Sequence, residues 1–402
     1  MKSIGIIAEY NPFHDGHKYL IETASALCEA DVCVSVMSGN FVQRGGYAYF
    51  DKWRRAEHAV KQGVDLVVEL PQIYASASAK HFAGAGVKIL SKLSCNNIVF
   101  GSESGDIEKL KTLADILSMV EAPESGDVYE RFKTGIKEKS KEGLTYPAAR
   151  EAVLNELFPD IDLSIIKKSN DILAIEYLRA LKNLTKENAD TNEAENPNES
   201  ESQMSPVAIK RIGDDYSKSA GSIREALKLD DVEGPRLSKM QKKYFELVRY
   251  GIISKSEDEL EGFDSANEGL GNKLKKAIRH ARTIDDLIER VKSKRYTYTR
   301  ISRLLTHILL VNNMLESRSP SYDNVYIRPL AMNEKGARYV REIKDKKELL
   351  FVDDVAKAIR YEKDESIVDA LMTDIRAADI YAMLQDRDMY SESDFVRKTI
   401  LL

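Results

Sequence analysis

Two histidines, His14 and His17, lie three residues apart in a loop that follows a short apolar run at residues 4–8. The residues after the loop have helical spacing, so the loop leads from a strand to a helix N-terminus, where backbone N–H groups and the helix dipole favour phosphate. Gly16 allows close approach of the backbone to a ligand, and Pro12 stiffens the approach. Displacement at a nucleotide α-phosphate needs cations and hydrogen-bond donors where negative charge develops. Two imidazoles at a helix N-terminus supply such groups.

A metal site is the main alternative for this histidine pair. Histidines at this spacing can bind zinc, but a zinc site needs a third and usually a fourth ligand. The remaining four histidines show no companion pattern: His58, His81, His280 and His307. A purely structural role would be unusual in a loop so rich in glycine and proline. The residues therefore favour a nucleotide-binding loop, and we predict no metal ligands.

The first hundred residues alternate short apolar runs with segments of helical spacing. The apolar runs, predicted to be strands, lie at residues 4–8, 32–37, 66–70 and 98–100. Near-continuous apolar strands separated by helices predict a parallel sheet covered on both faces. Ligands of such sheets bind beyond the carboxyl ends of the strands, so the loops after these four runs should surround one crevice. The predicted fold class is α/β, with a Rossmann-like N-terminal domain.

The rest of the chain divides by its periodicity. We expect an α/β domain at 1–230, a mainly helical region at 231–318 and a small C-terminal α/β unit at 319–402. Short strands are predicted in that last unit, at 325–327 and 349–352. Residues 186–203 contain almost nothing to bury, which predicts a disordered surface insertion.

Composition restricts the class of protein. Apolar residues make up 43% of the chain and charged residues 31%, with a net charge of -5, which is ordinary for a soluble protein. Three cysteines are too few for a disulfide scaffold and suggest a reducing compartment. No stretch approaches the ~20 apolar residues of a membrane span, and the N-terminal apolar run is too short for a signal peptide. We therefore expect a cytoplasmic protein without membrane contact, and nothing in the sequence indicates a protein partner.

Positive charge concentrates at residues 273–303, which hold eleven Lys or Arg against three Asp or Glu. This basic block could supply the phosphate contacts that RNA requires. Its core, 292–300, interleaves cations with Tyr296 and Tyr298, which could stack on unpaired bases. A solvated helix face with the tyrosines packed inward explains the pattern equally well.

The string N-P-F-H-D-G-H at 11–17 resembles the H-x-G-H signature of the nucleotidyltransferase superfamily. Further strings make nearly the whole chain similar to the bacterial tRNA(Met) cytidine acetate ligases: M-S-G-N-F-V-Q-R-G at 37–45, D-K-W-R at 51–54, V-V-E-L-P at 67–71, F-G-S-E at 100–103 and Y-T-Y-T-R at 296–300. The similarity is densest in residues 1–105.

This resemblance implies a two-step reaction. Acetate attacks the α-phosphate of ATP to give acetyl-adenylate and pyrophosphate, and the acetyl group then passes to the exocyclic amine of the wobble cytidine in elongator tRNA(Met). His14 and His17 would be the catalytic residues that stabilise adenylation, with Mg²⁺ on the ATP phosphates. Residues 1–230 would then form the ATP and acetate domain, and 231–318 the tRNA-binding region.

The resemblance also implies the ATP contacts. The family's ATP-binding stretch maps to fourteen consecutive residues: Ile7, Ala8, Glu9, Tyr10, Asn11, Pro12, Phe13, His14, Asp15, Gly16, His17, Lys18, Tyr19 and Leu20. Three separate contacts map to Gly101, Asn170 and Arg211. Gly101 lies at the end of a predicted strand, and Arg211 closes another apolar run at 207–212. For Asn170, position alone makes a helix N-cap nearly as good an interpretation as a ligand role.

The superfamily's second signature survives as S-A-G-S-I-R at 219–224, where Gly221 replaces the family's threonine. The sequence does not decide which of Ser219, Ser222 and Arg224 contacts phosphate. Two other functions remain open. A metabolite adenylyltransferase would need only the first domain and no basic block, whereas a non-catalytic RNA-binding module would not need the intact histidine pair.

Overall fold

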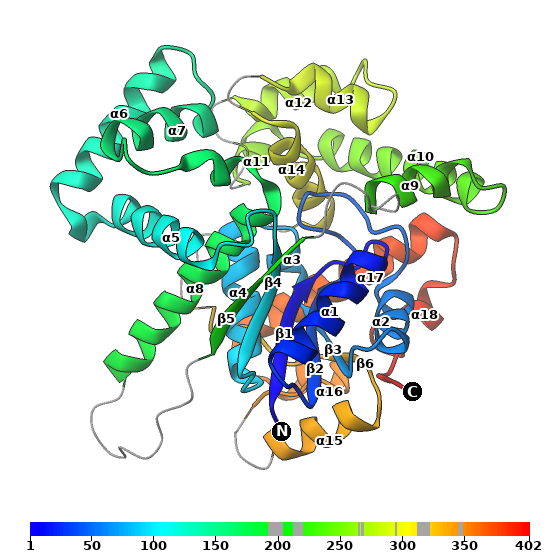
Figure 1. Ribbon diagram of the computed structural model, residues 1–402. Helices are drawn as coiled ribbons and strands as arrows, with labels where there is room; N and C mark the ends of the chain where they lie inside the picture. Colours follow the sequence, from blue (N-terminus) through cyan, green and yellow to red (C-terminus); the bar gives the residue numbers. More distant parts are fainter. Residues whose placement is uncertain are drawn as a thin grey trace.

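The computed structural model describes residues 1–191, 204–211, 220–263, 266, 269–293, 296–311, 322–344 and 349–402. Within them a seven-stranded sheet crosses the centre of the molecule in the order β5-β4-β1-β2-β3-β6-β7 (Figure 1). The strands are β1 (Ser3–Ala8), β2 (Val32–Ser38), β3 (Leu66–Leu70), β4 (Asn97–Ser102), β5 (Ser205–Lys210), β6 (Pro329–Met332) and β7 (Ile400–Leu401). Strands β1 to β5 are mutually parallel, β6 runs antiparallel to β3, and β7 is parallel to β6.

Helices cover both faces of the sheet. Those between the parallel strands are α1 (Asp15–Leu27), α2 (Lys52–Lys61), α3 (Gln72–Ala75), α4 (Ala79–Lys92), α5 (Ile107–Glu121), α6 (Asp127–Lys141), α7 (Tyr146–Leu157) and α8 (Ser169–Thr191), with 3-10 turns η1 (Pro123–Ser125) and η2 (Leu163–Lys167). Because side chains alternate along a strand, β2 packs Val34 and Val36 into the core shared with α4 and α8. It packs Cys33 and Met37 into the core shared with α1 and α2.

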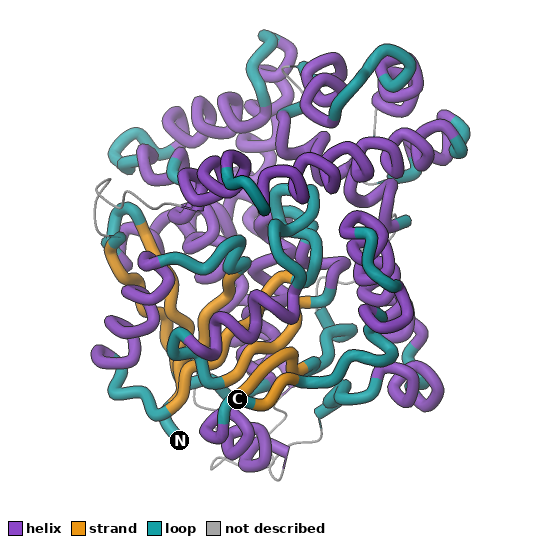
Figure 2. The backbone as a smooth tube through the Cα atoms, turned by 90° about the vertical axis from the view of Figure 1, so that its right-hand side faces the viewer, coloured by secondary structure: helices purple, strands orange, loops and turns teal. Residues whose placement is uncertain are grey.

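A group of helices lies beyond the carboxyl ends of the parallel strands (Figures 1 and 2). It comprises α9 (Ala220–Leu229), α10 (Glu233–Ile253), α11 (Glu257–Glu261), α12 (Leu270–Ala277), α13 (Ile284–Val291) and α14 (Tyr298–Leu310). These helices have an apolar core of their own, which also takes in Phe41 from the loop after β2 and Tyr381 from α17 (Glu365–Gln385). The helical region is therefore packed directly against the loops where a ligand of the sheet would bind.

The C-terminal residues contribute to the central sheet. Besides β6, β7 and α17, they form α15 (Glu334–Lys344), α16 (Val355–Tyr361) and α18 (Met389–Glu392). The strands expected at 325–327 and 349–352 are absent from the described residues, where a single bridge joins Ile327 to Phe351. The strand pairing occurs instead at β6 and β7, which extend the N-terminal sheet beyond β3.

The α/β fold with a mostly parallel sheet is confirmed. The four N-terminal runs form β1 to β4, and the run expected at 207–212 forms β5, two residues earlier. Helix α8 continues through residues 186–191, where the disordered insertion was expected to begin. The remainder of that segment, 192–203, lies outside the described residues.

Candidate functional site

The histidine pair forms the N-terminal cap of α1. His14 is the N-cap residue, and its Nδ1 accepts a hydrogen bond from the backbone N–H of Gly16 at 3.1 Å. The Nδ1 of His17 accepts in turn from the backbone N–H of His14 at 3.2 Å. The rings stack with their centroids 3.8 Å apart. Because each Nδ1 is an acceptor, a neutral ring carries its proton on Nε2, so each imidazole presents an Nε2–H donor.

The surroundings keep both imidazoles neutral near pH 7. Burial lowers the pKa of His17 well below its usual value, and the nearby His14 and Arg211 lower it further. Burial and then Arg211 also lower the pKa of His14, with a smaller contribution from Arg224 and an opposing one from Asp15. The two arginines therefore add positive charge beside a pair of neutral donors. Such an arrangement can stabilise charge that develops on phosphate oxygens.

Gly16 is needed for a reason that the sequence did not reveal. A Cβ atom at this position would lie 2.9 Å from Cε1 of His14 and 3.1 Å from its Nδ1. The space beside the glycine thus holds the His14 ring, and the hydrogen bond from Gly16 fixes that ring. The glycine between the two histidines permits the cap itself.

Contacts on both sides fix the loop before α1. Tyr10 is 1% exposed, and its hydroxyl accepts a hydrogen bond from Ser35 Oγ at 3.0 Å, so its side chain belongs to the core. The side chain of Asn11 accepts from Tyr49 N at 2.8 Å, and its backbone carbonyl accepts from Arg224 Nη1 at 2.9 Å. Arg224 of the S-A-G-S-I-R string is thereby hydrogen-bonded to the N-P-F-H-D-G-H string.

A second cluster forms where β4 and β5 end. The backbone N–H of Arg211 donates to the Ser102 carbonyl at 2.9 Å. A Cβ atom on Gly101 would lie 3.5 Å from Cγ of Arg211, an ordinary contact, so packing within the protein does not require glycine there. Asn170 Nδ2 donates to Glu103 Oε1 at 2.7 Å. The three predicted contacts from distant parts of the chain, Gly101, Asn170 and Arg211, thus meet around one loop.

The N-terminus of α8 is capped from that loop. Glu103 accepts from the backbone N–H groups of Asn170 at 3.3 Å and Asp171 at 3.0 Å. Asn170 is the second residue of α8 and therefore not its N-cap. Asp171, fully buried, accepts in return from Ser102 Oγ, from Glu103 N at 2.9 Å and from Ser104 N at 3.2 Å. These reciprocal bonds fix the loop after β4 against α8.

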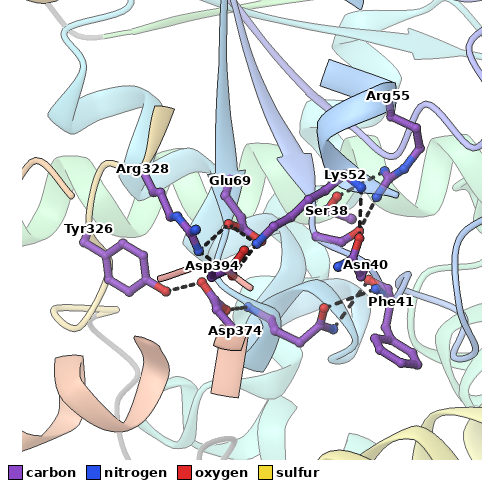
Figure 3. A network of polar contacts seen from close by, with 12 residues as sticks. Ser38, Asn40, Phe41, Lys52, Arg55, Glu69, Tyr326, Arg328, Asp374 and Asp394 are labelled. Atoms are coloured by element: carbon purple, nitrogen blue, oxygen red, sulfur yellow. Dashed lines mark hydrogen bonds and ion pairs between the residues drawn. The ribbon is translucent and has the colours of Figure 1, made fainter. Parts of the chain in front are cut away.

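A network of buried charged side chains surrounds Glu69 of β3 (Figure 3). Lys52 Nζ pairs with Glu69 Oε1 and Asp394 Oδ2, both at 2.7 Å. Arg328 Nη1 pairs with the same Asp394 oxygen at 2.7 Å and with Glu69 Oε2 at 3.1 Å. Two cations thus balance two carboxylates in the interior, as buried charges require. The network joins the C-terminal segment to α2 and β3.

Asp374 adds a proton-binding group to this network. It accepts from Gln72 N at 2.7 Å and from the Tyr326 hydroxyl. Burial, and then the charge of Glu69, raise the pKa of Asp374 to about 7. Gly39, at the end of β2, has no room for a side chain because a Cβ atom would lie 2.7 Å from Glu69 Oε1. The network therefore also shapes the backbone that follows β2.

The basic block at 273–303 is only partly as expected. Tyr296 is 4% exposed and packs in the helical core, which matches the inward-facing interpretation. Tyr298 is 42% exposed, and its hydroxyl donates to Asp285. Residues 294 and 295 lie outside the described residues. Of the two aromatic side chains, Tyr298 alone is accessible for stacking on a base.

The loop after β2 joins this block to the nucleotide loop. Gly45 has φ +84°, and a Cβ atom on it would lie 2.4 Å from the backbone carbon of Ser302 in α14. The next residue, Gly46, donates its N–H to Thr306 Oγ1 at 2.7 Å. On its other side, the same loop donates from Gln43 N to Glu9 Oε1 at 2.9 Å. The RNA-binding candidate and the phosphate-binding candidate are therefore neighbours.

Comparisons with known proteins show the family of this chain. A model of the HIGH Nucleotidyl Transferase family matches residues 1–394. The tRNA(Met) cytidine acetate ligase of Clostridium perfringens is 38% identical over 96% of both chains, and that of Caldanaerobacter subterraneus is 37% identical over the full length of both. The chain belongs to the tRNA(Met) cytidine acetate ligase family.

Solved structures of this ligase family have the same fold. Thermotoga maritima TmcAL bound with alpha-thio ATP is 29% identical, with a TM-score of 0.83 over the whole of both chains. The apo form of that protein is 28% identical with the same TM-score of 0.83. The resemblance seen in the motifs is thus confirmed for the entire chain.

Within this ligase fold, the ATP-contact roles assigned to residues 7–20, Gly101, Asn170 and Arg211 stay predictions, but the structure brings these residues to one edge of the sheet. Of the second signature, Arg224 reaches the nucleotide loop, Ser222 is exposed on α9, and Ser219 lies outside the described residues. Among the described helices none is long and apolar enough to cross a bilayer.

Sequence reasoning missed three residues of the site: Glu103, Asp171 and Arg55. Glu103 lies two residues after the predicted ligand Gly101, in the string F-G-S-E, and Asp171 directly follows the predicted ligand Asn170, so a nearby carboxylate was the available clue. Arg55 directly follows the string D-K-W-R, and its contacts with distant backbone carbonyls leave no local pattern.

Proposed function

We propose that the protein activates acetate with ATP and transfers the acetyl group to the wobble cytidine of elongator tRNA(Met), giving N4-acetylcytidine. The observation that carries this proposal is the pair of neutral imidazoles at the N-terminus of α1, with Arg211 and Arg224 beside them. Full-length similarity to tRNA(Met) cytidine acetate ligases supports it, because that similarity includes the helical region as well as the nucleotide loop.

In the first step, a carboxylate oxygen of acetate attacks the α-phosphorus of ATP. The bond from that phosphorus to the β-phosphate oxygen breaks, and pyrophosphate leaves. Negative charge grows on the α-phosphate oxygens and on the departing group. We assign the Nε2–H donors of His14 and His17 to stabilising that charge, together with the guanidinium groups of Arg211 and Arg224. No protein group becomes acylated.

In the second step, the exocyclic N4 amine of cytidine attacks the carbonyl carbon of acetyl-adenylate. A C–N bond forms, the bond from the acyl carbon to the phosphate oxygen breaks, AMP leaves, and one amine proton passes to solvent. A wobble base lies in a single-stranded loop and can be turned outward for this chemistry. The helical region beside the nucleotide loop is our candidate surface for the tRNA, through the basic block at 273–303.

We assign magnesium to the substrate, entering as the MgATP complex. The described residues include no group of three His, Cys, Asp or Glu side chains placed to hold a metal ion. Acetate and tRNA(Met) are the other substrates, and we place the reaction in the cytoplasm, where all three are present.

Mass spectrometry of tRNA nucleosides tests the proposal. Purified protein is incubated with ATP, acetate and tRNA, and the tRNA is then digested. We expect N4-acetylcytidine at the wobble position of elongator tRNA(Met) only when all three substrates are present, with equal amounts of AMP and pyrophosphate. Formation of ADP and phosphate, or an unmodified tRNA pool from active protein, would contradict the assignment.

A further inference from the structure

Arg55 is the fourth residue of α2 and is 3% exposed, and within the described part of the chain it donates hydrogen bonds only to backbone carbonyls. Its Nη1 donates to the carbonyl of Glu9 at 2.6 Å and to that of Ser38 at 3.1 Å, and its Nη2 donates to that of Gly39. Its Nε donates to the Phe50 carbonyl at 2.9 Å. Figure 3 shows the guanidinium reaching the backbone at Ser38.

These carbonyls mark the edge of the sheet where the site lies. Glu9 directly follows β1, Ser38 ends β2 and Gly39 follows it. The guanidinium therefore ties together the carboxyl ends of two neighbouring central strands. His14 follows the end of one of those strands by six residues, and the other strand continues into the loop that contacts α14. A planar group with five donors in a fixed fork suits this task, whereas a lysine ammonium cannot span the same acceptors.

The charge of Arg55 is not neutralised at close range. Among the described residues, no carboxylate oxygen forms an ion pair with Arg55, in contrast to Lys52 and Arg328, which share Glu69 and Asp394. Burial lowers the pKa of Arg55, the charges of Asp51, Glu9 and Glu69 oppose that shift from beyond ion-pair distance, and an arginine stays protonated in proteins. A buried cation that forms no ion pair with the described carboxylates, at the carboxyl edge of a parallel sheet, attracts anions to that edge.

We propose that Arg55 is a positioning residue for adenylation. It holds the backbone after β1 and β2 in the geometry that places the histidine pair, and its charge attracts the ATP phosphates to the crevice. This inference rests on the proposed function. It assigns no direct contact between Arg55 and ATP.

Two substitutions of Arg55 distinguish the effect of its hydrogen-bonding geometry from the effect of its charge. Arg55→Met removes both the fork and the charge, so ATP binding measured by calorimetry should weaken about 10- to 30-fold, as expected for losing one charge at moderate distance. Exchange of pyrophosphate into ATP at saturating ATP and acetate should slow about 100-fold, the effect of a small misplacement of catalytic groups. Arg55→Lys keeps the charge without the fork, so ATP affinity should stay within about threefold of the parent while exchange still slows at least about tenfold.

Arg376→Met is the matched control. Arg376, on α17, also donates from Nη1 to a backbone carbonyl, but to that of Leu310 in α14 at 2.7 Å rather than to the backbone after β1 or β2. Its loss should leave exchange within about threefold of the parent. Thermal unfolding and circular dichroism of every variant establish that it is folded, and low-temperature assays cover any variant with a reduced Tm.

The outcomes are distinct. A folded Arg55→Met that binds ATP and exchanges pyrophosphate like the parent overturns the proposal. It is also overturned if Arg55→Lys loses ATP affinity as much as Arg55→Met, or if Arg376→Met loses exchange as much as Arg55→Met. Failure of the parent protein itself to exchange pyrophosphate would instead refute the proposed function.

Discussion

Replacing His17 with alanine should slow adenylate formation about 100- to 1,000-fold. The His17 ring is neutral, so the substitution removes a hydrogen-bond donor and no formal charge. One preorganised donor directed at developing charge contributes about 2.7–4 kcal/mol to the transition state. The donor of His14 and the charges of Arg211 and Arg224 remain, which is why activity falls without vanishing.

The same substitution has a smaller structural effect. It removes the acceptor for the backbone N–H of His14, which is half of the capping box of α1. Losing a helix cap costs about 1 kcal/mol, a fraction of the about 5–15 kcal/mol that stabilises a typical folded protein. We therefore expect a folded variant whose ATP affinity changes much less than its rate.

Acetate-dependent exchange of pyrophosphate into ATP measures the rate, and calorimetry measures ATP affinity. His58→Ala is the matched control. His58 is an exposed residue of α2, and its ring stacks on Phe13, in the loop before α1, with ring centroids 5.7 Å apart. It should exchange within about threefold of the parent. A folded His17→Ala variant that also stays within about threefold would refute the role assigned to the histidine.

Three further predictions concern the supporting residues. Asp171→Ala leaves the N–H groups of the loop after β4 without their acceptor, so ATP affinity by calorimetry should fall about tenfold; unchanged affinity would contradict the loop's role. Burial raises the pKa of Asp374 to about 7 in the folded protein, whereas the same carboxyl in the unfolded chain loses its proton above about pH 4. The free energy of unfolding should therefore fall as pH rises from about 4 to 7. Asp374→Asn should therefore raise Tm relative to the parent at pH 8 more than at pH 5, and an equal change at both pH values would disprove this. Exchanging Lys292 and Arg300 for glutamine should weaken tRNA binding and reduce its salt slope by about one per lost phosphate contact, with pyrophosphate exchange retained; equal loss of both activities would place the block in the ATP site.

The sheet and the nucleotide loop could be predicted because their signals are local. The apolar runs of β1 to β4 and the H-D-G-H string each lie within a few consecutive residues, and a parallel sheet places the loops after them at one edge. The same rule anticipated that Gly101 and Arg211 would lie at that edge, and Arg211 is close enough to the histidines to add to the lowering of their pKa values by burial.

The supporting contacts could not be predicted because they join distant parts of the chain. Three of the carbonyls that accept from Arg55 lie 16 to 46 residues away, and a backbone carbonyl has no sequence identity to recognise. Asn170 is the second residue of α8 rather than its N-cap. The cap comes from Glu103, 67 residues earlier in the chain, which accepts from the backbone N–H of Asn170. The two C-terminal strands were misplaced because β6 pairs with β3 across the sheet, and its short apolar run resembles its neighbours at 325–327.

The fate of the acetate oxygen tests the central claim most directly. Attack of acetate on the α-phosphorus transfers one carboxylate oxygen to the nucleotide, and cleavage of the acyl bond in the second step leaves that oxygen on AMP. With acetate labelled with ¹⁸O in both oxygens and tRNA as acceptor, we predict one ¹⁸O atom in each AMP formed, measured by mass spectrometry. Unlabelled AMP, or ¹⁸O in inorganic phosphate together with ADP, would contradict an acetyl-adenylate formed at the His14 and His17 site.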